Sequence, residues 1–374
     1  MALKDTVEES DVGVGARILS FIGRALLAII IPLIAFAILY AGFLFLRDSD
    51  APKWLIAIIA ILWGVGGVAL LYWIFNGIVE RLPDEWTARL QPFVFVGPAI
   101  VILLAYLAVP TVRTFYLSLL DRDGEEFVGF ANYVAILTER LLQESLRNNL
   151  LWIIFGSTFS VISGLLIAVL ADRSRFERIS KTFIFLPMAI SFVGASVIWN
   201  FIYEVRPAAL PQIGLLNAIV VGLGGDPKPW YAWVDIAPWN NLFLIVIVIW
   251  LQAGFAMVLF SAALKGIPDE LLEAARVDGA NEIQIFFRIM IPYIMGTLIT
   301  VWTTIVIFTL KIFDVVWVMT GGQFGTHVIA TQFYRQAFTA RNSGFGSAIA
   351  IVLLVAVIPV MFYNLRQFRE QEAF

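Results

Sequence analysis

The sequence contains no cysteine and only one histidine, His327, in 374 residues. These absences exclude disulfide bridges, thiol catalysis and metal sites built from clustered cysteine or histidine side chains. Charged residues are also scarce, at 14% of the chain against about 25% in soluble domains, and the net charge of −3 provides no basic surface for nucleic acid. Hydrophobic residues make up 60% of the chain, which is typical of an integral membrane protein.

Catalytic motifs are missing as well. The chain has no G-x-x-x-x-G-K-[ST] phosphate loop, no H-E-x-x-H metalloprotease motif and no G-x-S-x-G nucleophile motif. We therefore expect a protein that is not an enzyme, with no catalytic residue, no bound metal and no cofactor of its own.

Eight apolar runs are long enough to cross a bilayer, which takes about 20 residues in a helix. Because unpaired backbone groups are costly in lipid, each run is predicted to be helical. The expected fold class is therefore all-α, a polytopic membrane protein with about eight transmembrane helices. The runs cover roughly residues 25–46, 54–76, 93–112, 149–171, 182–203, 242–264, 293–319 and 346–365.

An even number of spans places both termini on the same side of the membrane. Lysine and arginine are denser in the segments that face inward if the N-terminus is inside, and such a bias marks the cytoplasmic side. Four of these residues, Arg173, Arg175, Arg178 and Lys181, lie close together between two spans. We expect a multi-pass membrane protein with both termini in the cytoplasm.

The first two spans are predicted to be an addition to a core of six. The expected parts are a cytoplasmic segment over 1–24, two added transmembrane helices over 25–92, the core over 93–366 and a cytoplasmic tail over 367–374. The stretch 206–241 is rich in proline and is predicted to be an ordered outer loop.

The segment 265–292, between the sixth and seventh spans, is predicted to form a helix–turn–helix at the cytoplasmic face. Pro268 suits the first position of a helix, and Gly279 suits a left-handed exit from that helix. Asn281 and Gln284 have the spacing of a capping pair, which predicts a second short helix.

The first helix of this segment is predicted to expose the small residues Ala274 and Ala275 beside Glu273, so that a partner protein can approach its backbone closely. The pattern Glu-Ala-Ala, three residues, Gly, nine residues, Ile-x-Ile-Pro resembles the EAA motif of permease subunits in bacterial binding-protein-dependent ABC importers. The resemblance implies a type I ABC importer permease fold and a coupling helix that docks on an ATPase subunit. By this resemblance, the ATPase-coupling residues are Glu273, Ala274, Ala275, Asp278, Gly279 and Pro292.

Other stretches, such as 127–133, 181–187 and 214–217, resemble the MalF-like permeases of the carbohydrate-uptake branch. The outer segment 113–148 is too short for the folded insertion of the maltose permease, so the chain is more similar to permeases for α-glucosides, trehalose or glucosylglycerol. The resemblance implies three kinds of protein partner: a second homologous permease, a dimer of ATPase subunits that bind ATP and magnesium, and a periplasmic or lipid-anchored solute-binding protein. Membrane lipid surrounds the spans.

A path for a sugar needs aromatic faces for its apolar surface and polar groups for its hydroxyls. By the resemblance, Trp250, Gln252 and Phe255 of the sixth span and Thr309 of the seventh line this path. Gln252 stands where the family has glycine. Plain helix packing remains the alternative reading of the two aromatic residues.

The seventh span also carries a polar stripe, whose residues are further candidates for the lining of this path. At about 100° per residue, Thr304, Lys311 and Asp314 fall on one face of a continuous helix, opposite Thr309. Lys311 and Asp314 are three residues apart and can pair, or they can lie at the outer interface.

The function that the resemblance implies is that of a permease subunit in an ATP-driven importer of a di- or oligosaccharide or of a glucosylglycerol-like osmolyte. The alternative is an ion-coupled secondary transporter or channel, in which Lys311 and Asp314 form the coupling site.

Overall fold

The computed structural model describes residues 14–80, 84–207 and 209–371, with side chains from residue 30 to residue 366. The start of the predicted N-terminal segment (residues 1–13) and the end of the predicted tail (residues 372–374) lie outside the described residues. Within the described part of the chain all regular structure is helical, and the only β pairing is one bridge between Leu120 and Phe127. The predicted all-α fold class is confirmed.

The chain forms two compact units, one ending at Pro110 and the other beginning at Thr111. The helices of the first unit are α1 (Val14–Asp48), α2 (Lys53–Val79) and α3 (Asp84–Leu103), followed by a π-helical turn (Leu104–Ala108). Their described apolar side chains are mostly exposed, as expected of helices that face lipid. The predicted division into two added helices and a core of six stays a prediction.

The helix α4 (Val109–Ser118) leads into the second unit. The helices up to the segment 265–292 are α5 (Ala131–Thr138), α6 (Arg140–Leu151), α7 (Thr158–Asp172), α8 (Glu177–Phe185), α9 (Phe192–Tyr203), α10 (Leu215–Gly222) and α11 (Asn241–Lys265). The helices within and after that segment are α12 (Asp269–Val277), α13 (Glu282–Ile285), α14 (Ile291–Tyr293), α15 (Met295–Leu310), α16 (Asp314–Thr320), α17 (Ile329–Tyr334) and α18 (Ser343–Gln371). Short π-helical turns join several of these helices, as at Trp152–Ser157 and Phe286–Met290.

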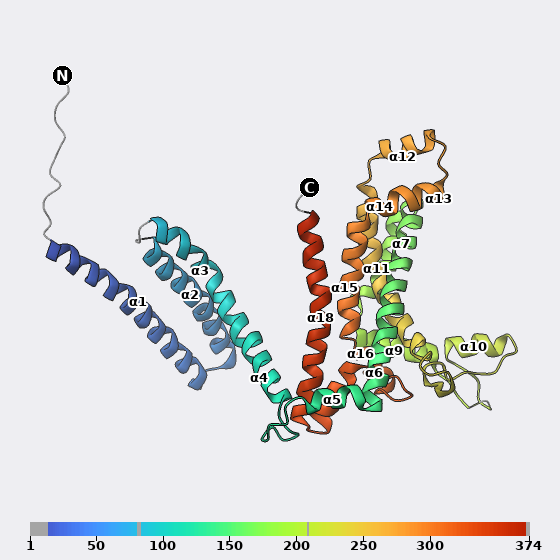
Figure 1. The fold of residues 1–374 in the computed structure, drawn as a ribbon, viewed down its shortest axis with the longest axis horizontal. Helices are drawn as coiled ribbons and strands as arrows, with labels where there is room; N and C mark the ends of the chain where they lie inside the picture. The colour runs from blue at the N-terminus through green and yellow to red at the C-terminus, as the bar shows by residue number, and fades with distance from the viewer. Residues whose placement is uncertain (1–13, 81–83, 208, 372–374) are drawn as a thin grey trace. The chain divides into compact units, whose positions relative to one another are not determined.

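The long helices α7, α11, α15 and α18 of the second unit run side by side, with α12 and α13 across one end and α5, α6 and α10 at the other (Figure 1). The core centres on α11, in which more than half of the residues are buried. A Cβ atom on Gly164 of α7 would overlap Ala256 of α11 and lie 2.9 Å from the backbone nitrogen of Met257. A small residue therefore permits the close crossing of α7 and α11, as is usual between membrane helices.

Six helical stretches of the described chain are long and apolar enough to cross a membrane, and eight if each of two bent pairs counts as one span. The predicted number of eight agrees with the larger count. The bent pairs are Glu177–Ala189 with Phe192–Tyr203, at 104°, and Glu282–Tyr293 with Met295–Leu310, at 71°.

The prediction of one continuous helix over 293–319 is wrong. The helix α15 ends at Leu310, and α16 begins at Asp314 after a non-helical break. The break is stabilised by Asn149, whose side-chain nitrogen donates to the carbonyl of Leu310 over 3.1 Å. A buried amide from another helix thus satisfies a carbonyl that the helix end leaves unpaired.

The outer loop predicted over 206–241 is ordered. It contains α10 and lies at the end of the unit opposite α12 (Figure 1). The buried side chain of Asn217 donates to the carbonyls of Glu204 and Lys228 over 3.0 and 3.1 Å and accepts from the backbone nitrogen of Lys228 over 2.9 Å. These three bonds fix the path of the loop.

Candidate functional site

The segment between α11 and α13 has the predicted helix–turn–helix form. Asp269 and Glu270 lie in the first turn of α12, near the positive end of its dipole. Gly279 has φ +82°, a conformation in which a side chain is strained, so the predicted left-handed exit is confirmed. The capping box of Asn281 and Gln284 is also confirmed, with both bonds at 2.9 Å.

One position in this segment differs from its prediction. Pro268 is the N-cap of α12, with ψ 134°, and not its first helical residue. The extended backbone at Pro268 turns the chain sharply after α11, so that α12 lies across the end of the bundle (Figure 1).

The two faces of α12 differ in composition. The side chains of Leu272 and Ala275 point toward the bundle, and Ala275 is only 9% exposed. The prediction that Ala275 lies on the outer face is therefore wrong, because Ala275 is three residues from Leu272 and shares its inner face. Glu273 and Ala274 are exposed as predicted.

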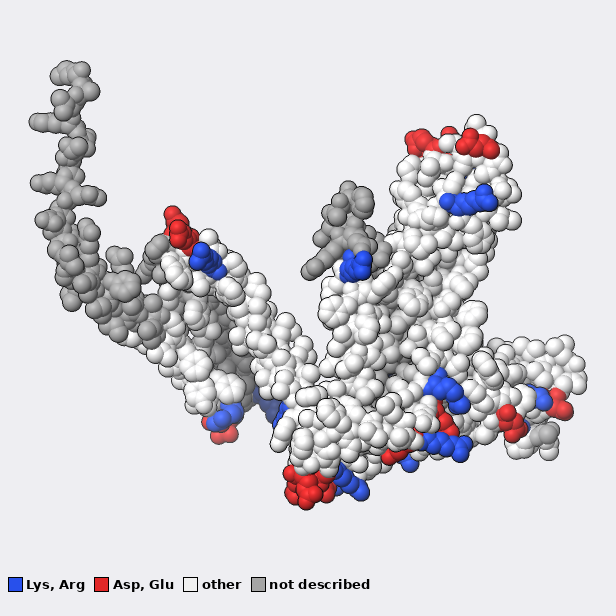
Figure 2. Space-filling model, in the orientation of Figure 1, with Lys and Arg blue, Asp and Glu red and all other residues white. Residues whose placement is uncertain are grey.

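The exposed surface of α12 is acidic and partly apolar. Figure 2 shows acidic side chains gathered at this end of the second unit, with basic side chains just below them. The exposed acidic residues of α12 and its cap are Asp269, Glu270, Glu273 and Asp278. Val277 is 87% exposed beside them. Such a surface is suited to a partner protein that offers basic groups around a small apolar hollow.

Ion pairs join the α12 segment to α7. The carboxylate of Glu282 accepts from Nη2 of Arg173, directly after α7, over 2.9 Å and from Nε of Arg276, in the last turn of α12, over 3.1 Å. These residues border a cavity of about 460 Å³ beneath α12. The position of α12 is thus tied to the end of a membrane-spanning helix.

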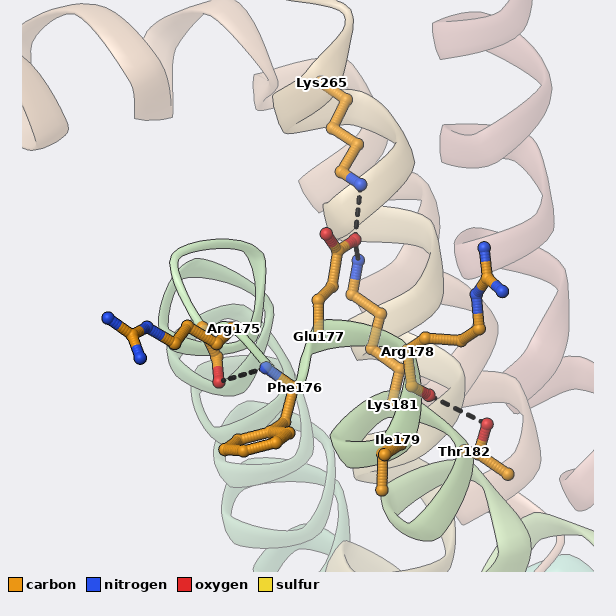
Figure 3. Close-up of a pocket in the computed structure, with 9 residues that line it drawn as sticks. Arg175, Phe176, Glu177, Arg178, Ile179, Lys181, Thr182 and Lys265 are labelled. Carbon is orange, nitrogen blue, oxygen red and sulfur yellow. Dashed lines mark hydrogen bonds and ion pairs between the residues drawn. The ribbon is translucent and has the colours of Figure 1, made fainter.

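A second group of charges joins α7, α8 and α11 beside the first. The ammonium of Lys181 contacts the carboxylates of Asp172 and Glu177 and the hydroxyl of Ser261, and Glu177 also binds Lys265 (Figure 3). Because Lys181 and Asp172 are mostly buried, this cluster fixes the turn between α7 and α8 against the end of α11.

A separate cavity of about 290 Å³ lies between α9, α11 and α15. It brings together three of the residues predicted for the solute path, Gln252, Phe255 and Thr304, with a predominantly apolar wall. Gln252 is only 7% exposed, yet among the described residues its side-chain amide has no hydrogen-bond partner. The amide of Gln252 lines the cavity, so its donor and its acceptor can pair with a ligand there. The remaining wall residues are Met188, Ile190, Phe192, Leu251 and Phe308.

Trp250 does not line this cavity. It packs edge-to-face against Trp199, with ring centroids 6.0 Å apart, in an aromatic cluster with Tyr203 and Phe243. The indole nitrogens of Trp199 and Trp230 in this cluster are buried without a partner among the described groups. Trp199 was not predicted as a site residue, because aromatic residues near a span end are equally typical of an interfacial belt.

Three further predicted path residues also lie away from the cavity. Thr309 is 1% exposed, and its hydroxyl donates to the carbonyl of Ile305 over 2.7 Å, in the packed interior beside Gly156. Lys311 follows the last residue of α15, and Asp314 is the first residue of α16. Their places at a helix C-terminus and a helix N-terminus suit their charges. Within the described chain they form no ion pair with one another, and they belong to two separate helices, so the structure does not show the alternative in which they pair on one continuous helix face.

The comparisons with known proteins decide the family. Residues 156–370 match the family described as "Binding-protein-dependent transport system inner membrane component". The chain belongs to this family. The match covers more than half of the chain and includes α12, the cavity and the aromatic cluster.

Two relatives of this permease are strongly similar in sequence. The "Osmoprotective compounds uptake permease protein GgtC" of Synechocystis is 54% identical over 74% of this chain and 99% of its own length. The "Alpha-glucoside transport system permease protein AglF" of Rhizobium meliloti is 50% identical over 79% of this chain and 89% of its own length. The predicted likeness to permeases of the α-glucoside and glucosylglycerol type is confirmed.

The fold of the permease agrees with solved structures. A chain in the crystal structure of a bacterial alginate ABC transporter, in complex with an alginate pentasaccharide-bound periplasmic protein, superimposes with a TM-score of 0.66 at 21% identity. The similarity covers 78% of this permease and 98% of that chain, which confirms the predicted type I importer fold. The permease is accordingly a multi-pass protein of the inner membrane.

Proposed function

We propose that this permease carries a glucoside or a related osmolyte across the inner membrane, delivered by a solute-binding protein outside and driven by a separate ATPase. The observation that carries the proposal is the identity of 54% and 50% with permeases named for osmoprotective compounds and α-glucosides. The family match and these relatives also favour an ATP-driven importer over the alternative of an ion-coupled secondary transporter.

The cavity of Gln252 suits such a solute chemically. Phe255 and Phe308 offer apolar surface to the C–H groups of a sugar ring, and the amide of Gln252 offers both a donor and an acceptor to its hydroxyls. The hydroxyl of Thr304 donates to the carbonyl of Thr300 over 2.7 Å, so its oxygen remains available to accept. At about 290 Å³ the cavity is small, which suits one or two sugar units.

The proposed energy source is ATP, bound with magnesium by the partner ATPase and not by this chain. The exposed acidic face of α12 supports docking of that ATPase, and Glu282 offers a direct route from α12 to α7. A movement of α12 is then transmitted through rigid contacts to the helices around the cavity.

The remaining parts of the proposed assembly are a second, homologous permease and a dimer of ATPase subunits. We place α12 and the C-terminus in the cytoplasm, and the location of α18's last residues at the same end as α12 supports this orientation (Figure 1). The N-terminus is assigned to the same side because the number of spans is even.

Uptake by cells tests the proposal. A strain without this chain is expected to lose energy-dependent uptake of labelled glucosylglycerol or of a labelled α-glucoside, while uptake of a labelled amino acid continues. Dissipating the proton gradient while ATP is maintained is expected to leave the uptake largely intact. Undiminished uptake of every glucoside tested in the deletion strain would contradict the proposed substrate class.

A further inference from the structure

The turn before α8 and the first part of α8 form an exposed amphipathic segment, which we call the 175–183 segment. Phe176, Ile179 and Phe183 follow one another at intervals of three and four residues and so share one face. Phe176 and Phe183 are each 66% exposed. Arg175 and Arg178 border this apolar face and are exposed as well.

The segment lies at the level where spans end. The candidate spans containing α7 and α11 end at Asp172 and Lys265, and the salt-bridge cluster of Glu177 joins these two ends. A helix directly beside such ends lies at the boundary between hydrocarbon and headgroups. Amphipathic helices with basic residues on the polar side are stable in that boundary.

The charges of this segment are unbalanced. Its one carboxylate, Glu177, is occupied by Lys181 and Lys265. No acidic group within the described parts of the chain lies at ion-pair distance from Arg175 or Arg178. In Figure 3 the two guanidinium groups extend to opposite sides of the segment, while the side chains of Phe176 and Ile179 point away from Lys265.

We propose that the 175–183 segment is a binding surface for anionic phospholipid. The two arginines contact the phosphates of neighbouring lipids on either side of the helix. The apolar face packs against the part of the acyl chains nearest the headgroups. Charge complementarity supports lipid as the occupant, because the guanidinium groups are unpaired and flank residues that are suited to hydrocarbon. The proposal does not depend on which solute is transported.

Native mass spectrometry of the full chain in a neutral detergent measures this binding. The protein is titrated with phosphatidylglycerol and, separately, with phosphatidylcholine that has the same acyl chains. The test variants are R175Q/R178Q and R178Q alone. The control is R341Q, which removes an exposed arginine from the loop before α18, at the end opposite α12.

The first phosphatidylglycerol is expected to bind about 30-fold less tightly to R175Q/R178Q than to the unaltered chain, because two arginines near a lipid surface are removed. R178Q is expected to lose about fivefold, and R341Q and all phosphatidylcholine affinities are expected to stay unchanged. The proposal is overturned if R175Q/R178Q binds phosphatidylglycerol normally, or if millimolar inorganic phosphate displaces the lipid. It is also overturned if the arginines affect only co-purification of the ATPase, since the surface then belongs to a protein partner.

Discussion

Arg173 and Glu282 are 109 residues apart in the sequence, and Nη2 of Arg173 donates to Oε2 of Glu282 over 2.9 Å. Arg173 directly follows α7, and Glu282 begins the helix after the α12 turn. A contact between these two residues links a membrane helix to the segment on which we propose that the ATPase docks. Exposed ion pairs contribute little to folding, about 0–1 kcal/mol, so this one is better explained by its position than by stability.

Reversing the charge at position 282 is expected to impair transport more than folding. Glu282→Arg places a third cation beside Arg173 and Arg276 and is expected to lower glucoside uptake per ATP hydrolysed severalfold. Adding Arg173→Glu restores an ion pair of opposite polarity and is expected to recover part of the loss. The same reversal in the exposed pair of Arg140 and Glu144, 2.9 Å apart, serves as control and is expected to have no effect on that ratio. Equal losses in both pairs would contradict the assigned role.

Gln252→Leu removes the one polar side chain of the cavity wall that lacks an internal partner. If this amide pairs with a solute hydroxyl, the KM for uptake is expected to rise about 3- to 10-fold, in accordance with one neutral hydrogen bond. Thr303→Val is the control, because Thr303 is 1% exposed, bonds to the carbonyl of Ile299 and does not line the cavity. An unchanged KM in Gln252→Leu would remove this cavity from the solute path.

Asn149→Ala is expected to destabilise the permease. Asn149 donates to the carbonyl of Leu310 over 3.1 Å and accepts from the backbone nitrogen of Ile329 over 2.7 Å, so alanine leaves two buried groups unpaired. The expected loss is about 2 kcal/mol or more, measured by thermal unfolding in detergent. Asn200→Ala removes only an exposed bond to the hydroxyl of Tyr231 and is expected to change the unfolding temperature little. Equal stability of the two variants would show that the break after α15 does not depend on Asn149.

His327 gives a pH-dependent signal that can be assigned without ambiguity, since it is the only histidine. Burial lowers its pKa below the usual 6.5, Arg335 lowers it further by repulsion, and Glu144 acts in the opposite direction. The pKa of His327 is lower in the folded chain than in the unfolded chain. Its contribution to the free energy of unfolding is therefore fully present above about pH 6.5 and is lost as the pH falls through the folded pKa. An NMR titration of the ring protons is expected to show a midpoint below 6.5. A midpoint above that value would contradict the lowered pKa of this half-buried imidazole.

Local signals in the sequence predicted the spans and the turn after α12 well, because each depends on residues close together in the chain. Gly279 and the pair Asn281 and Gln284 encode that turn directly. The break after Leu310 could not be predicted in this way. The apolar run continues across the break, and the residue that stabilises it, Asn149, lies 161 positions earlier.

The same reason limited prediction of the solute path. Resemblance grouped Trp250 with Gln252 and Phe255, but the structure separates Trp250 from the cavity because the side chain packs on Trp199 of another helix. Thr304 lines the cavity, whereas Thr309 on the same helix does not, because Thr309 is buried against the turn at Gly156. Which face of a membrane helix is enclosed depends on its neighbours, and a hydrophobic run contains little information about them.

Cross-linking from Ala274 tests most directly whether α12 docks on a separate ATPase. Because the chain has no cysteine, Ala274→Cys introduces its only thiol, which can carry a photoactivatable cross-linker in native membranes. We expect a covalent adduct with an ATPase subunit that contains a phosphate loop, and no such adduct from Ala218→Cys, an exposed position on α10 at the opposite end. Adducts of Ala274→Cys with lipid alone, under conditions in which ATP-driven uptake is active, would contradict the account.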